Sequence, residues 1–159
     1  MRKRLLLMIG VVGMLGATNL HAQVRFGGQV GYADDADLGL GARVQVGLPN
    51  LNQIQFIGSF DLYFPSSVSG VDVNYWEING NLKYDFAISN PMFGPYVGTG
   101  LHLAHASASI QGSGVSDTRL GLNILGGMAF HTGPMTPFAE LRVEVGGGEQ
   151  VILTGGLLF

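Results

Sequence analysis

The chain has 159 residues, no cysteine, and eight Lys and Arg against eleven Asp and Glu, which gives a formal net charge of −3 at pH 7. The absence of cysteine excludes disulfides, thiolate catalysis and cysteine-ligated metals, and the acidic balance argues against nucleic acid as a partner. The length suits a single domain.

The first 22 residues have the pattern of a secretion signal. Three basic residues at 2–4 precede an apolar run over 5–15, and Ala22 offers a small residue for cleavage. The run is shorter than the roughly 20 apolar residues of a spanning helix, which favours a cleaved signal over an uncleaved anchor. We therefore predict a signal peptide over 1–22 and a mature domain over 23–159, with five basic residues against eleven acidic ones.

The rest of the chain alternates in steps of two, with no sustained helical period. All six prolines fall in turns or at segment ends, and glycine recurs inside the segments, as a tightly curved sheet allows. Eight segments of strand length result, at 24–32, 36–47, 53–64, 73–86, 95–106, 118–131, 136–145 and 150–159. The longest loop is predicted over 107–117, a stretch rich in Gly and Ser and the best candidate for a mobile segment.

Each segment has one apolar and one polar face. In the second segment Leu38 and Leu40 share the apolar face, whereas Arg43 and Gln45 share the polar one. With all segments phased together, five basic and five acidic residues fall on the polar faces: Arg25, Arg43, Asp61, Glu77, Lys83, Asp85, Arg119, Glu140, Arg142 and Glu144. A water-exposed surface would carry about 25–35% charged residues, whereas an Arg or Lys facing lipid costs about 2–4 kcal/mol. The charge-free face is therefore expected to contact lipid.

This pattern predicts an all-β fold, an eight-stranded antiparallel up-and-down transmembrane β-barrel. A soluble antiparallel sandwich would also alternate, and it is the charge-free face that favours the membrane. Eight strands enclose an interior just wide enough for side chains, so we expect a lumen closed by paired charges. The remaining acids lie in or beside connections, where Asp34, Asp35 and Asp37 form either a solvated acidic tip or a Ca²⁺ site.

The last segment ends on an aromatic residue and carries Leu153, Leu157 and Phe159 on one apolar face. On this segment, the signal peptide and the stretches 95–101, 121–128, 137–142 and 156–159, the chain resembles the small eight-stranded outer-membrane β-barrels, the group of the OmpA transmembrane domain, OmpX and the opacity-like porin-family proteins. The resemblance implies a monomer in the outer membrane of a Gram-negative-type bacterium. It implies outer-membrane lipid, lipopolysaccharide and the barrel-assembly machinery as partners, with Leu153, Leu157 and Phe159 as the assembly signal. We expect no cofactor and no metal.

Three functions remain open at this point. We expect a non-enzymatic structural or surface-interaction protein; the alternatives are a narrow channel or small-ligand-binding barrel, and a lipid A deacylase of the PagL type. His105 and Ser107 are similar to the His-x-Ser pair of those deacylases, and Asp117 is the nearest acid behind them. The same two residues would also mark the polar headgroup boundary. His102 and His131 point into the lumen toward opposite ends, so a shared metal is not expected.

Overall fold

The computed structural model describes residues 24–65, 72–110 and 113–159, and the predicted signal peptide lies outside these residues. Eight strands account for most of the described chain: β1 (Val24–Ala33), β2 (Asp37–Leu48), β3 (Leu51–Phe64), β4 (Asp72–Asp85), β5 (Phe93–Ile110), β6 (Ser113–Phe130), β7 (Thr136–Val145) and β8 (Gln150–Leu158). Among the described residues, no helix is long and apolar enough to cross a membrane.

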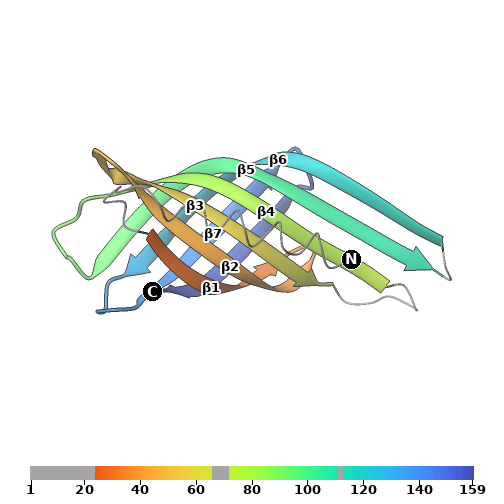
Figure 1. Ribbon diagram of the computed structural model, residues 1–159, viewed down its shortest axis with the longest axis horizontal. Coiled ribbons are helices and arrows are strands. Elements are labelled where there is room, and N and C mark those ends of the chain that lie inside the picture. Colours follow the sequence, from red (N-terminus) through yellow and green to blue (C-terminus); the bar gives the residue numbers. More distant parts are fainter. Residues whose placement is uncertain (1–23, 66–71, 111–112) are drawn as a thin grey trace, which may run out of the picture.

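The strands form one closed antiparallel barrel, in which each strand pairs with the next along the chain and β8 returns to β1 (Figure 1). The closing pair runs from Gly27 opposite Leu158 to Ala33 opposite Ile152. Closure leaves no free edge along the body of the barrel, which is what a sheet in lipid requires. The predicted fold and strand count are confirmed.

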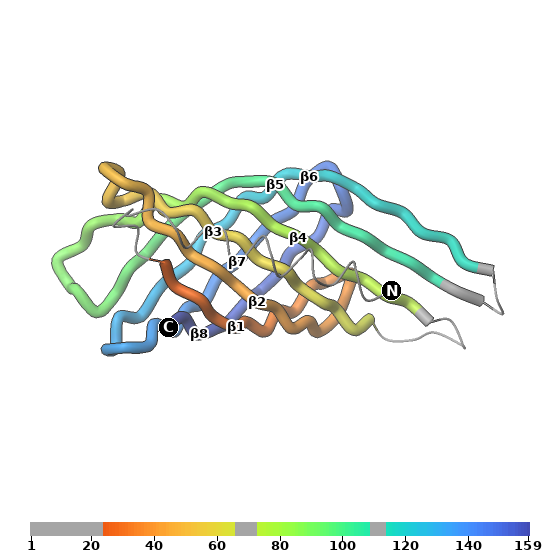
Figure 2. Tube along the Cα trace, in the orientation of Figure 1, coloured from red at the N-terminus to blue at the C-terminus, as the bar shows by residue number. Residues whose placement is uncertain are grey.

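The ends of the barrel differ in length. We call the end that holds Val24, Phe159 and the turns at 49–50, 86–92 and 131–135 the terminal end, and the opposite end the hairpin end. At the hairpin end, β5 and β6 pair without interruption up to Ile110 opposite Ser113, whereas β6 pairs with β7 only over 122–129. Residues 104–110 and 113–121 thus form a hairpin extension that reaches past β7, and β4 accompanies its β5 strand up to Ser109 (Figure 2).

This extension corrects the prediction of a long loop over 107–117. Only residues 111–112 separate the two strands, and they lie outside the described residues. The Gly and Ser content suggested a loop, because these residues have low strand propensity. However, β5 is paired with β4 up to Ser109 and with β6 up to Ile110, so its backbone donors and acceptors are satisfied on both sides. That ladder decides the local structure.

The outward face is apolar over the body of the barrel. Phe26, Ile124 and Leu153 have exposed fractions of 57%, 60% and 60%, in line with side chains that project from the sheet. Among the described side chains of the barrel body, no Asp, Glu, Lys or Arg points outward. The protein is therefore apolar outside and polar inside, as a lipid-embedded barrel must be.

The outward face changes chemistry where the hairpin extension begins. On β5, Leu101 and Leu103 are followed on the same face by His105 and Ser107, and on β6 Leu120 is preceded by Thr118. Trp76 stacks on His105 at this level, with ring centroids 5.0 Å apart. An amphipathic aromatic ring at the change from apolar to polar side chains is typical of a membrane interface.

Candidate functional site

Most of the large side chains that fill the described barrel interior are polar, alongside apolar ones such as Ile57, Leu125 and Ile152. Seven large side chains are less than 2% exposed, and five of them are polar: Arg142, His102, Glu77, Glu144 and Asn123. Burying polar groups is costly unless each finds a partner, so the contacts among these residues determine what the interior can do.

Three carboxylates surround the guanidinium of Arg142 on β7. Its Nη2 lies 3.0 Å from Glu77 Oε2, its Nε 2.9 Å from Glu144 Oε1, and its Nη1 4.0 Å from Asp61 Oδ2. Nη2 also donates to the Tyr63 hydroxyl at 3.4 Å. Contacts to β3 and β4 from a residue of β7 cross the lumen, so this group ties opposite walls together.

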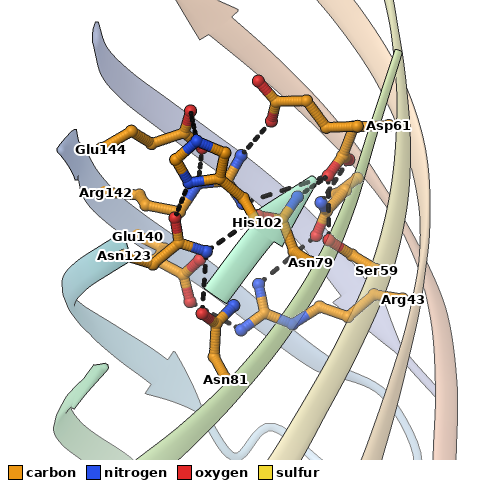
Figure 3. A network of polar contacts seen from close by, with 12 residues as sticks. Arg43, Ser59, Asp61, Asn79, Asn81, His102, Asn123, Glu140, Arg142 and Glu144 are labelled. Atoms are coloured by element: carbon orange, nitrogen blue, oxygen red, sulfur yellow. Dashed lines mark hydrogen bonds and ion pairs between the residues drawn. The ribbon is translucent and has the colours of Figure 1, made fainter. Parts of the chain in front are cut away.

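An amide bridge occupies the middle of the lumen (Figure 3). Asn123 Nδ2 donates to Asn79 Oδ1 and to Asn81 Oδ1, both at 2.8 Å, and Asn79 Nδ2 donates to Asp61 Oδ2 at 3.1 Å. His102 Nδ1 lies 2.7 Å from Asn123 Oδ1. The bridge joins β4, β5 and β6 to the carboxylate of β3.

A second ion pair lies beside this bridge. Arg43 Nη2 on β2 is 2.6 Å from Glu140 Oε2 on β7, and both side chains are at most 3% exposed. The Tyr96 hydroxyl donates to the same Glu140 oxygen at 2.9 Å, and the Arg43 guanidinium lies 4.3 Å from the centroid of the Phe138 ring. Gln29 accepts from Arg43 and donates to Asp61, which links the two ion-pair groups into one network.

At the hairpin end, Gln150 caps the network. Its Nε2 contacts Glu77 Oε1 at 2.5 Å and Glu144 Oε2 at 2.8 Å, and the Tyr75 hydroxyl donates to Glu77 Oε1 at 2.6 Å. Sequence reasoning placed Tyr75 on the polar face but missed Gln150. Its signal was available, because Gln150 has the same parity as the inward residues Ile152 and Thr154 of β8.

Nine of the ten charged residues predicted for the lumen point into the barrel, and Arg119 does not. Arg119 Nε pairs with Asp117 Oδ2 at 2.7 Å, and the two side chains are 63% and 56% exposed. β6 has no β7 partner at this height, because Arg119 lies in the hairpin extension. Four cations therefore face five carboxylates in the described interior, and the expected balance of five against five is corrected.

The terminal end of the lumen is open and forms a cup of about 320 Å³. Lys83 and Asp85 on β4 meet here, with Nζ 2.8 Å from Oδ1, and Lys83 Nζ lies 4.6 Å from the Tyr96 ring centroid. Arg25 Nη1 on β1 donates to Thr136 Oγ1 at 3.0 Å. The 86–92 turn and His131 complete the lining.

The structure does not bring His105, Ser107 and Asp117 into a triad. His105 Nδ1 lies 2.7 Å from Thr118 Oγ1. Asp117 is opposite Ala106 in the β5–β6 register, so it lies on the other face of the sheet from His105, and its carboxylate is taken by Arg119. Among the side chains that the structure describes, no acid is placed to orient the His105 imidazole for nucleophile activation.

The two other histidines considered from the sequence, His102 and His131, lie far apart in the barrel. His102 is buried beside the amide bridge, with Nε2 3.7 Å from Glu144 Oε2, whereas His131 lines the cup. Asp34 Oδ1 accepts from the Val151 backbone N–H at 2.9 Å, which ties the first hairpin-end turn to β8. No group of three or more His, Asp or Glu side chains placed to hold a metal ion occurs among the residues described.

Comparison with known proteins identifies the family to which this chain belongs. A family model described as "Outer membrane protein beta-barrel domain" matches residues 8–147. The chain belongs to this family. This membership and the apolar outer surface place the protein in the outer membrane of a Gram-negative bacterium.

Solved structures of other outer-membrane barrels share the fold. The N-terminal β-barrel domain of Pseudomonas aeruginosa OprF is 18% identical, with a TM-score of 0.67 over 87% of this chain and 100% of that one. Neisserial surface protein A is 24% identical, with a TM-score of 0.60 over 85% and 91% of the two chains. Ail, the attachment invasion locus protein of Yersinia pestis, is 18% identical, with a TM-score of 0.60 over 86% and 94%. No curated protein matches the sequence.

Proposed function

We propose that this family member is a non-enzymatic outer-membrane protein with a structural or surface-interaction role, and that its lumen is closed. The observation that carries the proposal is the cross-lumen network: Arg43 of β2 binds Glu140 of β7, and Arg142 of β7 binds Glu77 of β4. Solutes would have to break several buried ion pairs and the hydrogen bonds between the Asn side chains to pass. Short turns at 49–50 and 131–135 favour a periplasmic location of the terminal end.

Closure predicts that the purified protein does not conduct in a planar lipid bilayer. We expect no stable conductance steps from the wild type, and steps in a double variant Arg142→Ala, Asn123→Ala, which removes the central cross-lumen contacts. Arg119→Ala is the matched control, because it removes an exposed cation outside the lumen. Steady conductance from the wild type would instead support the narrow-channel alternative.

The non-enzymatic part of the proposal concerns His105 and Ser107. Their contacts, to Thr118 and Trp76, fit a polar boundary at the headgroup level, and Asp117 is on the opposite face. We therefore expect the same lipid A mass spectrum from membranes with the wild type, with Ser107→Ala and without the protein. Loss of an acyl chain in the wild-type sample only would establish the deacylase alternative.

The proposed partners are those of an outer-membrane resident. Outer-membrane lipid and lipopolysaccharide would contact the apolar face and the polar boundary around Trp76, and the barrel-assembly machinery would bind the outward residues Leu153, Leu157 and Phe159 of the last strand. We infer a monomer, because the barrel closes on itself.

One of the similar solved structures suggests a role at the cell surface, but the charge of this chain differs from what its ligand requires. The protein named for attachment and invasion has been solved in complex with a heparin analogue, sucrose octasulfate. Asp34, Asp35, Asp37 and Glu149 lie in or beside the hairpin-end connections of this chain, and Arg119 of the extension is already paired to Asp117. Such an acidic end would repel a sulfated polymer, so we propose that any surface partner is neutral or basic.

A further inference from the structure

The cup at the terminal end contains a cation with no acidic partner. Arg43, Lys83 and Arg142 each have a carboxylate in an ion pair. Arg25 is the one inward-facing cation of the described residues with no ion-pair partner, and its bond within the protein is to the Thr136 hydroxyl. A guanidinium is never neutral in practice and presents a planar fork of donors that matches a carboxylate. Arg25 is half-buried, and its guanidinium has donors available for an anion.

The same cup contains an acceptor without a donor. Asp85 Oδ1 accepts from Lys83 Nζ, but Asp85 Oδ2 is buried and has no hydrogen-bond partner. A buried polar atom is normally satisfied, so this oxygen indicates that a donor belongs beside it. Lys83 fixes the orientation of the carboxylate and itself packs over the Tyr96 ring.

The walls of the cup suit a small organic molecule rather than an inorganic ion. Ala87, Ile88 and Pro91 of the 86–92 turn and Ala129 of β6 give the lining an apolar part, beside the polar Gln45, Asn52 and Gln55. The volume of about 320 Å³ is at the lower end of the range for small-molecule sites. A mixed lining of this kind binds molecules that have both charged and apolar parts.

We propose that the cup binds a zwitterionic amino acid or short peptide, with its carboxylate on Arg25 and its ammonium group on Asp85. Arg25 and Asp85 belong to β1 and β4, so the two charged groups of the ligand are held from different walls. The proposal goes beyond the structural role above and does not depend on it, because the cup lies on one side of the closed network. Its mouth opens at the end that we place in the periplasm.

The test uses the mature barrel in detergent micelles and follows backbone amide NMR signals during titration with alanine, trialanine and N-acetylalanine. We expect saturable shifts confined to cup residues. Arg25→Gln should weaken alanine binding about tenfold or more, because it removes a charge-assisted hydrogen bond, while Arg119→Gln should leave binding unchanged. Tighter binding of alanine would identify free amino acids as the source, and tighter binding of trialanine would identify peptides.

The role of Asp85 is tested on the ligand as well as on the protein. N-acetylalanine has no ammonium group, so it should bind the wild type about tenfold more weakly than alanine does, and Asp85→Asn should abolish that difference. A heat-dependent gel shift shows that each variant is folded. Absence of saturable shifts in the wild type, or equal shifts in the Arg25→Gln variant, would overturn the proposal whatever the conductance result.

Discussion

At the scale of single residues, the interior shows how a polar core is held together inside an apolar shell. Arg142 is the centre, because three carboxylates from three strands converge on one guanidinium that is 2% exposed. Such an arrangement contributes little relative to a well-packed apolar core, but removal of one partner leaves charges buried and unpaired. The interior is therefore sensitive to single substitutions in a way that the surface is not.

Arg142→Met should lower the free energy of unfolding by about 3–5 kcal/mol, because Glu77 and Glu144 lose their cation. Arg119→Met, which removes an exposed ion pair, should change it by less than about 1 kcal/mol. Denaturant unfolding in micelles measures both. Adding Glu77→Gln to Arg142→Met should restore part of the loss, and equal stability of the two single variants would refute a central role for Arg142.

At the scale of elements, inward glycines let the strands approach the crowded lumen. A Cβ at Gly41 would collide with the Asp61 carboxylate, and one at Gly100 would collide with the Gly80 carbonyl and the Asn81 side chain. By contrast, a Cβ at Gly28, which points outward, would approach nothing closer than 3.9 Å. Glycine therefore occupies inward positions where neighbouring side chains such as Asp61 and Asn81 fill the space.

Substitutions at Phe159 and Phe26 can distinguish an effect on assembly in the outer membrane from an effect on stability. Phe159 and Phe26 exchange backbone hydrogen bonds of 2.8 and 3.3 Å, and their side chains are 64% and 57% exposed at the same end of the barrel. If the assembly machinery recognises the terminal residue, Phe159→Ala should lower the amount of folded protein in the outer membrane several-fold, whereas Phe26→Ala should not. Heat-dependent gel mobility of outer-membrane fractions measures this.

Refolding into micelles provides the control for that experiment. Both variants should refold with similar yield, because each loses one exposed ring at the same end of the barrel. An equal decrease of the two variants in the outer membrane would mean that an exposed ring at this end matters and the terminal position does not.

At the scale of the whole molecule, the depth in the membrane follows from the outward face. β6 crosses from the apolar region at Ile124 to the polar region at Ser116 on one face of one strand. The boundary lies near Trp76 and His105, whose stacked rings occupy the level between them. The hairpin extension is therefore outside the apolar layer, although its strands are continuous with the barrel.

Two arginine substitutions on this strand test the boundary. Ile124→Arg should destabilise the barrel in phospholipid vesicles by about 2–4 kcal/mol, and Ser116→Arg by less than about 1 kcal/mol, because the cost of a cation depends on depth. Denaturant unfolding from vesicles gives the two values. Similar costs would place Ser116 in the apolar layer and would contradict the boundary proposed here.

Alternation along the chain was enough to predict the faces of the strands, their number and the class of the protein. Side-chain direction in a strand repeats every two residues, so parity alone separates Leu40 and Ile124 from Arg43 and Glu140. The position of each residue along the barrel axis came only from the three-dimensional structure. Arg142 meets Glu77, 65 residues away, while Arg119 has the right parity but lies above the last β7 partner. The position of a residue along the barrel axis depends on the tilt and stagger of the strands around the closed barrel, which no local sequence pattern contains. The ion pairs, the hairpin extension and the cup could therefore be found only from the fold.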